Sequence, residues 1–106
     1  MSNTFTGKLL ADGQCATGKT AIYTVPVTTT AYVKAISFFN NNATDETVDL
    51  FVRKGATSRQ IKRFVLSQYD TGVWDIPFPM ATGNLIEAKS TTGAIVDFVV
   101  FGVEET

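Results

Sequence analysis

The sequence contains no histidine and a single cysteine, Cys15, among its 106 residues. Histidine is the usual general base of enzymes near neutral pH and a common ligand of metal ions, and most structural zinc sites need several cysteines. One cysteine also cannot form a disulfide within its own chain. The composition therefore argues against imidazole catalysis, most zinc sites and an internal disulfide.

Long apolar runs are missing as well. No run approaches the roughly 20 residues that span a bilayer, and the opening Met1-Ser2-Asn3-Thr4 lacks the apolar region of a signal peptide. The net charge is −1 with 18% charged residues, so the chain lacks the basic field of a typical nucleic-acid binder. We expect a protein with neither a membrane nor a nucleic-acid partner, made and kept in a reducing cytoplasm.

The most strand-like stretch lies before the middle of the chain. Two runs rich in β-branched and aromatic residues, Tyr32 to Phe39 and Thr47 to Arg53, flank the polar segment Asn40 to Glu46. This pattern predicts a β-hairpin. Apolar and polar residues alternate in the second run, with Phe51 as the exception, so one side is expected to pack and the other to face water.

Other short runs of strand composition alternate with turn residues along the whole chain. The pair Asp12-Gly13 predicts a turn after the first of these runs. Val73 to Pro79 contains two prolines, which exclude a central strand and predict an edge strand or an extended connector. A helix is an alternative for one run, but the β-rich context favours a strand there. The remaining predicted strands are Phe5–Leu10, Thr20–Val25, Arg59–Leu66 (the possible helix), Leu85–Lys89 and Ala94–Val103.

These features predict an all-β fold in a single domain, residues 1–106. A chain of this length can bury roughly two-thirds of its unfolded surface, which is enough for one core and too little for two. About eight short antiparallel strands with turns at near-regular spacing are typical of a β-sandwich. A jelly roll is the first topology that the pattern favours, and an immunoglobulin-like sandwich is the second.

The last predicted strand, Ala94 to Val103, differs from the others because apolar residues occupy both of its faces. Such a strand either lies in the centre of a sandwich or has its outer face covered by another subunit. Val99, Phe101 and Val103 are therefore candidate residues of a subunit interface.

Gly13 to Thr20 matches the phosphate-loop pattern G-x-x-x-x-G-K-[ST]. In a functional loop of this kind a helix follows the lysine and its N-terminus faces the phosphates. Here Lys19 precedes Ile22, Tyr23 and Val25, which begin a strand. We reject nucleotide binding and interpret the segment as a turn with an exposed lysine.

Other candidate sites have a simpler structural explanation. Asp45, Glu46 and Asp49 are close in sequence but lack the alternating oxygen ligands of a calcium loop, so solvated charge is favoured. Cys15 has only Lys19 as a charged near neighbour in sequence and is interpreted as an unreactive cysteine in a turn. No two acidic residues are placed by a recognisable acid–base signature. The sequence thus predicts a protein that is not an enzyme, with no catalytic residue, cofactor or metal ligand.

Aromatic residues could form a stacking platform for a sugar or a base, for which Tyr69, Trp74 and Phe78 are the candidates. Filling of the core is the favoured explanation for these side chains.

A basic cluster contains five of the nine basic residues within eleven consecutive positions. Positive charge on an edge strand prevents aggregation between sheets, and it can also dock on an acidic surface. Both interpretations stay open, and the second makes the cluster a candidate contact with an acidic protein surface or with the acidic end Glu104-Glu105 of a neighbouring copy. The residues are Arg53, Lys54, Arg59, Lys62 and Arg63.

Two stretches carry a resemblance to a known group of proteins. Ala21 to Pro26 with Thr30 to Ile36, and Leu85 to Phe98 with the closing Gly102 to Glu105, are similar to small virion-associated proteins of tailed bacteriophages. The resemblance covers roughly Thr20 to Glu105 and includes no catalytic motif. That group usually has Pro-Ala-Gly after the tyrosine strand, where this chain has Pro-Val-Thr.

The resemblance implies a small β-sandwich that serves as a capsid decoration (cement) protein, or as a module of a phage tail or fibre. In the first case we expect a homo-oligomer, with a trimer favoured, that binds the major capsid protein of its virion after synthesis in the bacterial host cytoplasm. In the second case we expect a receptor- or carbohydrate-binding module.

Overall fold

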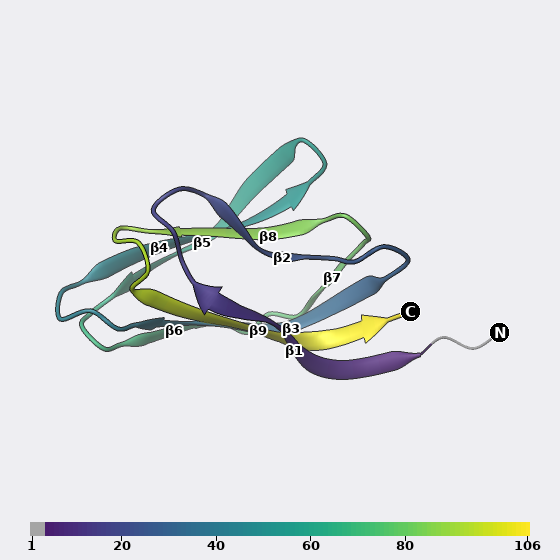
Figure 1. Ribbon diagram of the computed structural model, residues 1–106, viewed down its shortest axis with the longest axis horizontal. Coiled ribbons are helices and arrows are strands. Elements are labelled where there is room, and N and C mark those ends of the chain that lie inside the picture. The colour runs from purple at the N-terminus through teal and green to yellow at the C-terminus, as the bar shows by residue number, and fades with distance from the viewer. Residues whose placement is uncertain (1–3) are drawn as a thin grey trace.

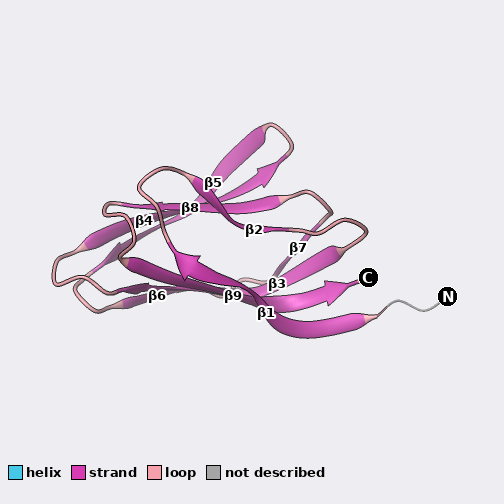
Figure 2. Cartoon of the chain, in the orientation of Figure 1, coloured by secondary structure: helices cyan, strands magenta, loops and turns pink. Residues whose placement is uncertain are grey.

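The computed structural model describes residues 4–106, and these residues form strands joined by loops and turns (Figure 1 and Figure 2). Strand β3, for example, alternates buried Ala31 and Val33 with partly exposed residues, as expected for a strand that has one face on the core. The strands are β1 (Phe5–Gln14), β2 (Thr20–Thr24), β3 (Thr30–Asn40), β4 (Glu46–Lys54), β5 (Thr57–Leu66), β6 (Thr71–Trp74), β7 (Phe78–Met80), β8 (Leu85–Ser90) and β9 (Val96–Glu105).

The strands form two antiparallel sheets that lie one above the other in Figure 1. The first sheet has the order β1-β9-β3-β6, and β7 also pairs with β3; the second has the order β2-β8-β4-β5. Because β6 and β7 both pair with β3, they occupy one edge position on either side of the segment 75–77. The strand order is that of an eight-stranded jelly roll, which confirms the predicted all-β sandwich and its first topology.

The apolar core lies between the two sheets. Val96, Phe98 and Val100 of β9 are buried there, as are Val48 and Leu50 of β4. Strand β9 lies between β1 and β3 in the first sheet, so one of its apolar faces packs on the core, whereas the other points away from the second sheet.

Gly102 of β9 is required by the close packing of two strands. A Cβ atom on this residue would lie only 2.3 Å from the backbone carbonyl oxygen of Tyr32, beside the register shift between Val33 and Ala35. Only glycine fits there without movement of the backbone.

The predicted hairpin around Asn40 to Glu46 is wrong. β3 pairs with β6, β7 and β9, whereas β4 pairs with β5 and β8, so the segment crosses from one sheet to the other. The buried Asn40 side chain stabilises this crossing: its amide group donates to the carbonyls of Thr44, Leu66 and Ser67. A period-two pattern specifies strands and their buried faces, but it does not specify the partner of each strand.

The predicted turn at Asp12-Gly13 is also wrong. Both residues lie inside β1, where they pair with Val99 and Phe98 of β9. The extended Gly13 backbone lies against the Phe98 ring, which a Cβ atom on residue 13 would approach to 3.2 Å. Here glycine admits a neighbouring ring instead of a turn.

The hairpin formed by β4 and β5 extends beyond the sandwich at the top of Figure 1. Its turn contains Gly55 at a φ of 60°, which suits glycine. Residues 59–66 form part of strand β5, which confirms the strand interpretation over the helix. Strand β5 is an edge strand, because it pairs only with β4 among the described strands.

Candidate interaction surfaces

The outer face of the first sheet carries an apolar surface that we call the outer apolar face, made by β1 and β9. The predicted interface residues Val99, Phe101 and Val103 all lie on it, opposite to the core residues of the same strand. Phe101 is 44% exposed, and its partner Leu9 on β1 is 51% exposed. The structure therefore places the three candidates on one face.

One hollow of about 410 Å³ lies on this face and crosses three strands. It is lined by Phe5 of β1, Val103 of β9, and Tyr32 and Lys34 of β3. Phe5 is 64% exposed. The Tyr32 hydroxyl donates a 2.7 Å hydrogen bond to a Glu105 carboxylate oxygen, which raises the pKa of Tyr32 and keeps its ring fixed.

The sequence pattern did not predict Phe5 and Leu9 as interface residues. These residues and Gly7 lie at period two on a strand that lacks other large apolar residues on the same side. This spacing was the sequence feature that could have indicated an exposed apolar face, but apolar residues on one side of a short strand are usually core residues.

The five basic residues of the predicted cluster all lie on β4 and β5, but they do not act together. Arg53 pairs with Glu87 at 3.1 Å, and Arg63 pairs with Asp49 at 2.7 Å. These two arginines neutralise carboxylates of the same subunit. The remaining three cations, which are free of ion pairs within residues 4–106, are Lys54, Arg59 and Lys62.

The free cations lie on the projecting hairpin. Lys54 and Arg59 line a hollow near its tip together with Val52 and Thr57. The Lys62 ammonium lies 5.7 Å from the centre of the Phe64 ring. All three side chains are exposed, so their charge is accessible to another molecule.

The acidic residues Glu46 and Asp49 are not solvated, so that prediction is wrong. Glu46 is buried, and its carboxylate accepts hydrogen bonds from the Thr92 backbone amide and the Asn42 side chain. Asp49 is also buried and accepts hydrogen bonds from Arg63 and Gln60. The paired guanidinium lowers the pKa of Asp49 below its usual value.

A second ionised network connects the same three strands, β4, β5 and β8. Burial alone would raise the pKa of Glu87, but hydrogen bonds from Ser58 and Arg53 outweigh it, so that the pKa is lowered. Among the described residues no cluster of three or more cysteine or carboxylate side chains could hold a metal ion. The outer side of this sheet is thus a charged surface whose acidic groups already have partners.

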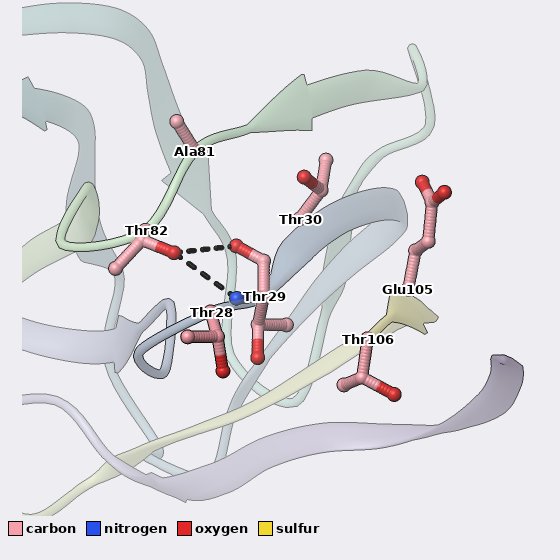
Figure 3. Close-up of a pocket in the computed structure, with 7 residues that line it drawn as sticks. All are labelled: Thr28, Thr29, Thr30, Ala81, Thr82, Glu105 and Thr106. Carbon is pink, nitrogen blue, oxygen red and sulfur yellow. Dashed lines mark hydrogen bonds between the residues drawn. The ribbon is translucent and has the colours of Figure 1, made fainter. Parts of the chain in front are cut away.

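A polar hollow of about 440 Å³ lies at the end of the molecule where the β2–β3 and β7–β8 connections meet (Figure 3). The Thr82 hydroxyl donates to the Thr29 carbonyl and accepts from the Thr29 amide. The hydroxyls of Thr28 and Thr29 both donate to the Val27 carbonyl. Most of these donors are therefore already used to shape the loop.

The segment that resembles a phosphate loop is a strand, a turn and a second strand. The segment begins at Gly13, inside β1, and β2 begins at Thr20, so a strand follows Lys19, as predicted. The Lys19 ammonium lies 4.9 Å from the centre of the Phe51 ring.

Cys15 is 2% exposed, and burial, with a smaller effect from Asp97, raises its pKa to about 12. The thiol is therefore protonated and inert, as expected for a buried cysteine.

The three aromatic candidates do not form a stacking platform. Trp74 and Phe78 are partly buried and pack against the core, as predicted. Tyr69 is 58% exposed in the turn before β6 and has a φ of 54°. Core filling thus describes two of the three residues, while Tyr69 is a loop residue.

No helix among the described residues is long and apolar enough to cross a membrane. No protein-family model and no curated protein sequence matches the chain.

Solved structures resemble the chain in fold. A protein of the Bacillus endospore appendages, described as disulfide-linked pili, aligns over 100% of this chain and 91% of its own, with 15% identity and a TM-score of 0.60. A chain from a virus-like particle of the extra small virus of the prawn Macrobrachium rosenbergii aligns over 99% of this chain and 80% of its own, with 13% identity and a TM-score of 0.54.

A chain of infectious bursal disease virus, Gx strain, aligns over 99% of this chain but only 33% of its own, with 8% identity and a TM-score of 0.51. All three likenesses are below 25% identity and concern the fold alone. This chain is similar in fold to β-sandwich proteins of viral particles and of a pilus.

Proposed function

We propose that this protein is a structural subunit of a virus particle, and that it decorates the capsid of a tailed bacteriophage as a cement protein. The observation that carries the proposal is the outer apolar face, where Phe101 and Leu9 remain half exposed on a central and an edge strand of the first sheet. Large exposed apolar patches mark interaction sites. Fold likeness to proteins of viral particles and of a pilus, together with the bacteriophage resemblance of the sequence, supports a role in assembly.

The proposed partners are further copies of this chain and the major capsid protein. A specific contact needs about 800 Å² per partner, and several modest contacts made at once give avidity without a tighter single contact. Val99, Phe101 and Val103 are the proposed contact between copies, for which a trimer is the state that the sequence-based argument favours. In this role the protein acts by contact area, without catalysis.

The accessible cations of the β4–β5 hairpin are the proposed capsid contact. Arg63 neutralises the buried Asp49, so a charge reversal there would damage the subunit itself. We therefore expect Lys54→Glu with Arg59→Glu to leave the subunit folded and to weaken attachment to an acidic shell surface. Raised salt should weaken attachment of the unmodified protein as well.

The deciding experiment is imaging of the particle. Density on the head lattice in hundreds of copies is the expected result.

A matched pair of variants tests the contact between copies: Phe101→Asp should weaken association at least tenfold, since a carboxylate buried without a partner costs several kcal/mol. Val65→Asp, at a residue that is 70% exposed on β5, should leave association unchanged. Equal association of both variants in sedimentation experiments would remove Phe101 from the interface.

The alternative is a receptor- or carbohydrate-binding module of a phage tail or fibre. The threonine-lined hollow in Figure 3 favours it, because the hydroxyl groups of Thr30 and Thr106 line the hollow and form no hydrogen bond within residues 4–106. Density confined to the tail, at a dozen copies or fewer, would favour this function over capsid decoration.

A further inference from the structure

Strand β1 is an edge strand with one side of its backbone open. It pairs with β9 alone among the strands of residues 4–106, and it follows the margin of the lower sheet in Figure 1. Thr4 and Thr106 exchange both backbone hydrogen bonds, at 3.1 and 2.9 Å. Residues that exchange both bonds alternate with residues whose N–H and C=O groups point away from the partner strand. Phe5, Gly7 and Leu9 are therefore the residues that direct their backbone groups to the open side.

The other three edges carry features that oppose pairing with another strand. β5 carries Arg59 and Lys62, and β6 and β7 are short segments separated by Pro77 and containing Pro79. β2 has five residues, is irregular in register and is soon followed by Pro26. β1 has ten residues and contains no proline; its register shift lies beyond Leu9, outside the segment Phe5 to Leu9, and its Lys8 is paired with Glu104 of the same subunit. It is thus the edge best suited to accept a further strand.

The side chains of the open residues make the edge complementary to itself. Because backbone direction and side-chain direction both alternate at period two, Phe5 and Leu9 project on the outer apolar face while their backbone groups face the open side. If two copies pair antiparallel about a two-fold axis at Gly7, Phe5 of each copy lies opposite Leu9 of the other. Both side chains are more than half exposed in the single subunit. Gly7 meets Gly7 on the axis, where no side chains crowd the contact.

We propose that a second copy of this chain docks along β1, with antiparallel β1 strands paired about Gly7, so that the first sheets of two subunits become one continuous sheet. The pairing satisfies the open backbone groups of Phe5, Gly7 and Leu9 and joins the two outer apolar faces. Isologous contacts of this kind are the usual basis of two-fold assemblies. The inference rests on the proposed assembly of identical copies and names the strand that forms one of their contacts.

Amide hydrogen exchange tests the pairing without any substitution. The amides of Thr6 and Lys8 bond to β9 and should be protected at every protein concentration. Those of Phe5, Gly7 and Leu9 should exchange rapidly in the dilute subunit and become at least tenfold slower as copies associate. Rapid exchange of these three amides in an associated sample would overturn the proposal, as would protection that appears only when a different protein is added.

Substitutions at Leu9 separate the contribution of the backbone N–H from that of the side chain. Leu9→Pro removes an N–H that is not bonded to β9 and should weaken pairing at least tenfold, whereas Leu9→Ala keeps that N–H and should weaken it less. Leu9→Lys should also weaken pairing, and Val65→Lys on the β5 edge is its control. A thermal unfolding transition establishes that each variant is folded. Equal association of all the variants would contradict the proposal.

The mass of the assembly gives an independent test. A two-fold contact produces dimers, or hexamers if trimers also form, so an association that stops at trimers would overturn the pairing. Failure of the pairing and failure of the proposed function are distinguishable. Head density with freely exchanging Phe5, Gly7 and Leu9 amides rejects only the pairing, whereas protected amides in a protein found only on the tail reject only capsid decoration.

Discussion

Replacement of Asn40 should reveal how the chain crosses between the sheets. The side chain is fully buried, and its amide group donates three hydrogen bonds, at 2.9 Å to Thr44, 3.2 Å to Leu66 and 3.0 Å to Ser67. Its carbonyl oxygen accepts a fourth, at 2.9 Å, from the Asn42 amide. A single residue therefore connects the end of β3 to the loop before β4 and to the end of β5.

The magnitude follows from what each lost bond leaves behind. A net hydrogen bond contributes about 1 kcal/mol, and a buried partner left unsatisfied costs about 1–3 kcal/mol. The Leu66 carbonyl is the buried partner, whereas Thr44 and Ser67 are exposed, so water can reach their carbonyls after the substitution. We expect Asn40→Ala to lower the free energy of unfolding by about 3 kcal/mol.

Urea unfolding measures this loss as a shift in the midpoint at constant slope. Asn40→Asp is the sharper variant, because a carboxylate of the same size can still accept from the Asn42 amide but cannot donate to three carbonyls. It should destabilise the protein at least as much as alanine at pH 7. Asn41→Ala, at the exposed neighbouring position, is the control and should change stability by less than about 0.5 kcal/mol. A loss below about 1 kcal/mol for both Asn40 variants would refute the role of this side chain in the crossing.

Three further predictions concern the sheets and the rejected motif. Tyr23→Phe removes the 2.7 Å hydrogen bond from β2 to Glu104 on the other sheet and should lower the free energy of unfolding by about 1–2 kcal/mol in urea unfolding. The pKa values of Asp49 and Glu87 are lowered in the folded state. Their ionised forms therefore stabilise the folded protein at pH values above their ordinary pKa values of 3.8 and 4.5. This stability should be lost as pH falls below about 4.5, and an unfolding midpoint that is unchanged from pH 6 to pH 3 would contradict it. Lys19→Ala should lower stability by no more than about 1 kcal/mol, through its lost contact with an aromatic ring, and ATP binding by the unmodified protein in calorimetry would show that the motif was wrongly rejected.

Local pattern predicted most of the strands because local pattern decides which backbone segments extend and which face they bury. Strands near residues 20–24, 57–66, 85–90 and 96–105 occur where β-branched and aromatic residues predict them. The two errors in the predicted fold, the hairpin and the turn, arose where one sequence motif is compatible with two structures. Asp12-Gly13 favours a turn but also allows a ring to pack against an extended strand, and Asn40 favours a loop of either kind.

The candidate surfaces divide in the same way. The apolar character of Val99, Phe101 and Val103 is a property of the sequence, so they could be selected as candidates before their face was known. Which cations stay accessible depends on the tertiary structure. Arg53 and Arg63 form ion pairs with Glu87 and Asp49, respectively, only because β4, β5 and β8 lie side by side. The open edge of β1 likewise exists only once β9 has taken its other side.

By itself the sequence determined that the chain forms an all-β sandwich, because alternation at period two and frequent turn residues are local properties that no distant residue must supply. Only the tertiary structure decided that the fold is a jelly roll with Asn40 at a crossing between sheets, that Glu46 and Asp49 are buried, and that Phe5 and Leu9 share an exposed face. Strand partners, ion pairs and open edges depend on contacts between residues far apart in the chain, which local periodicity does not encode.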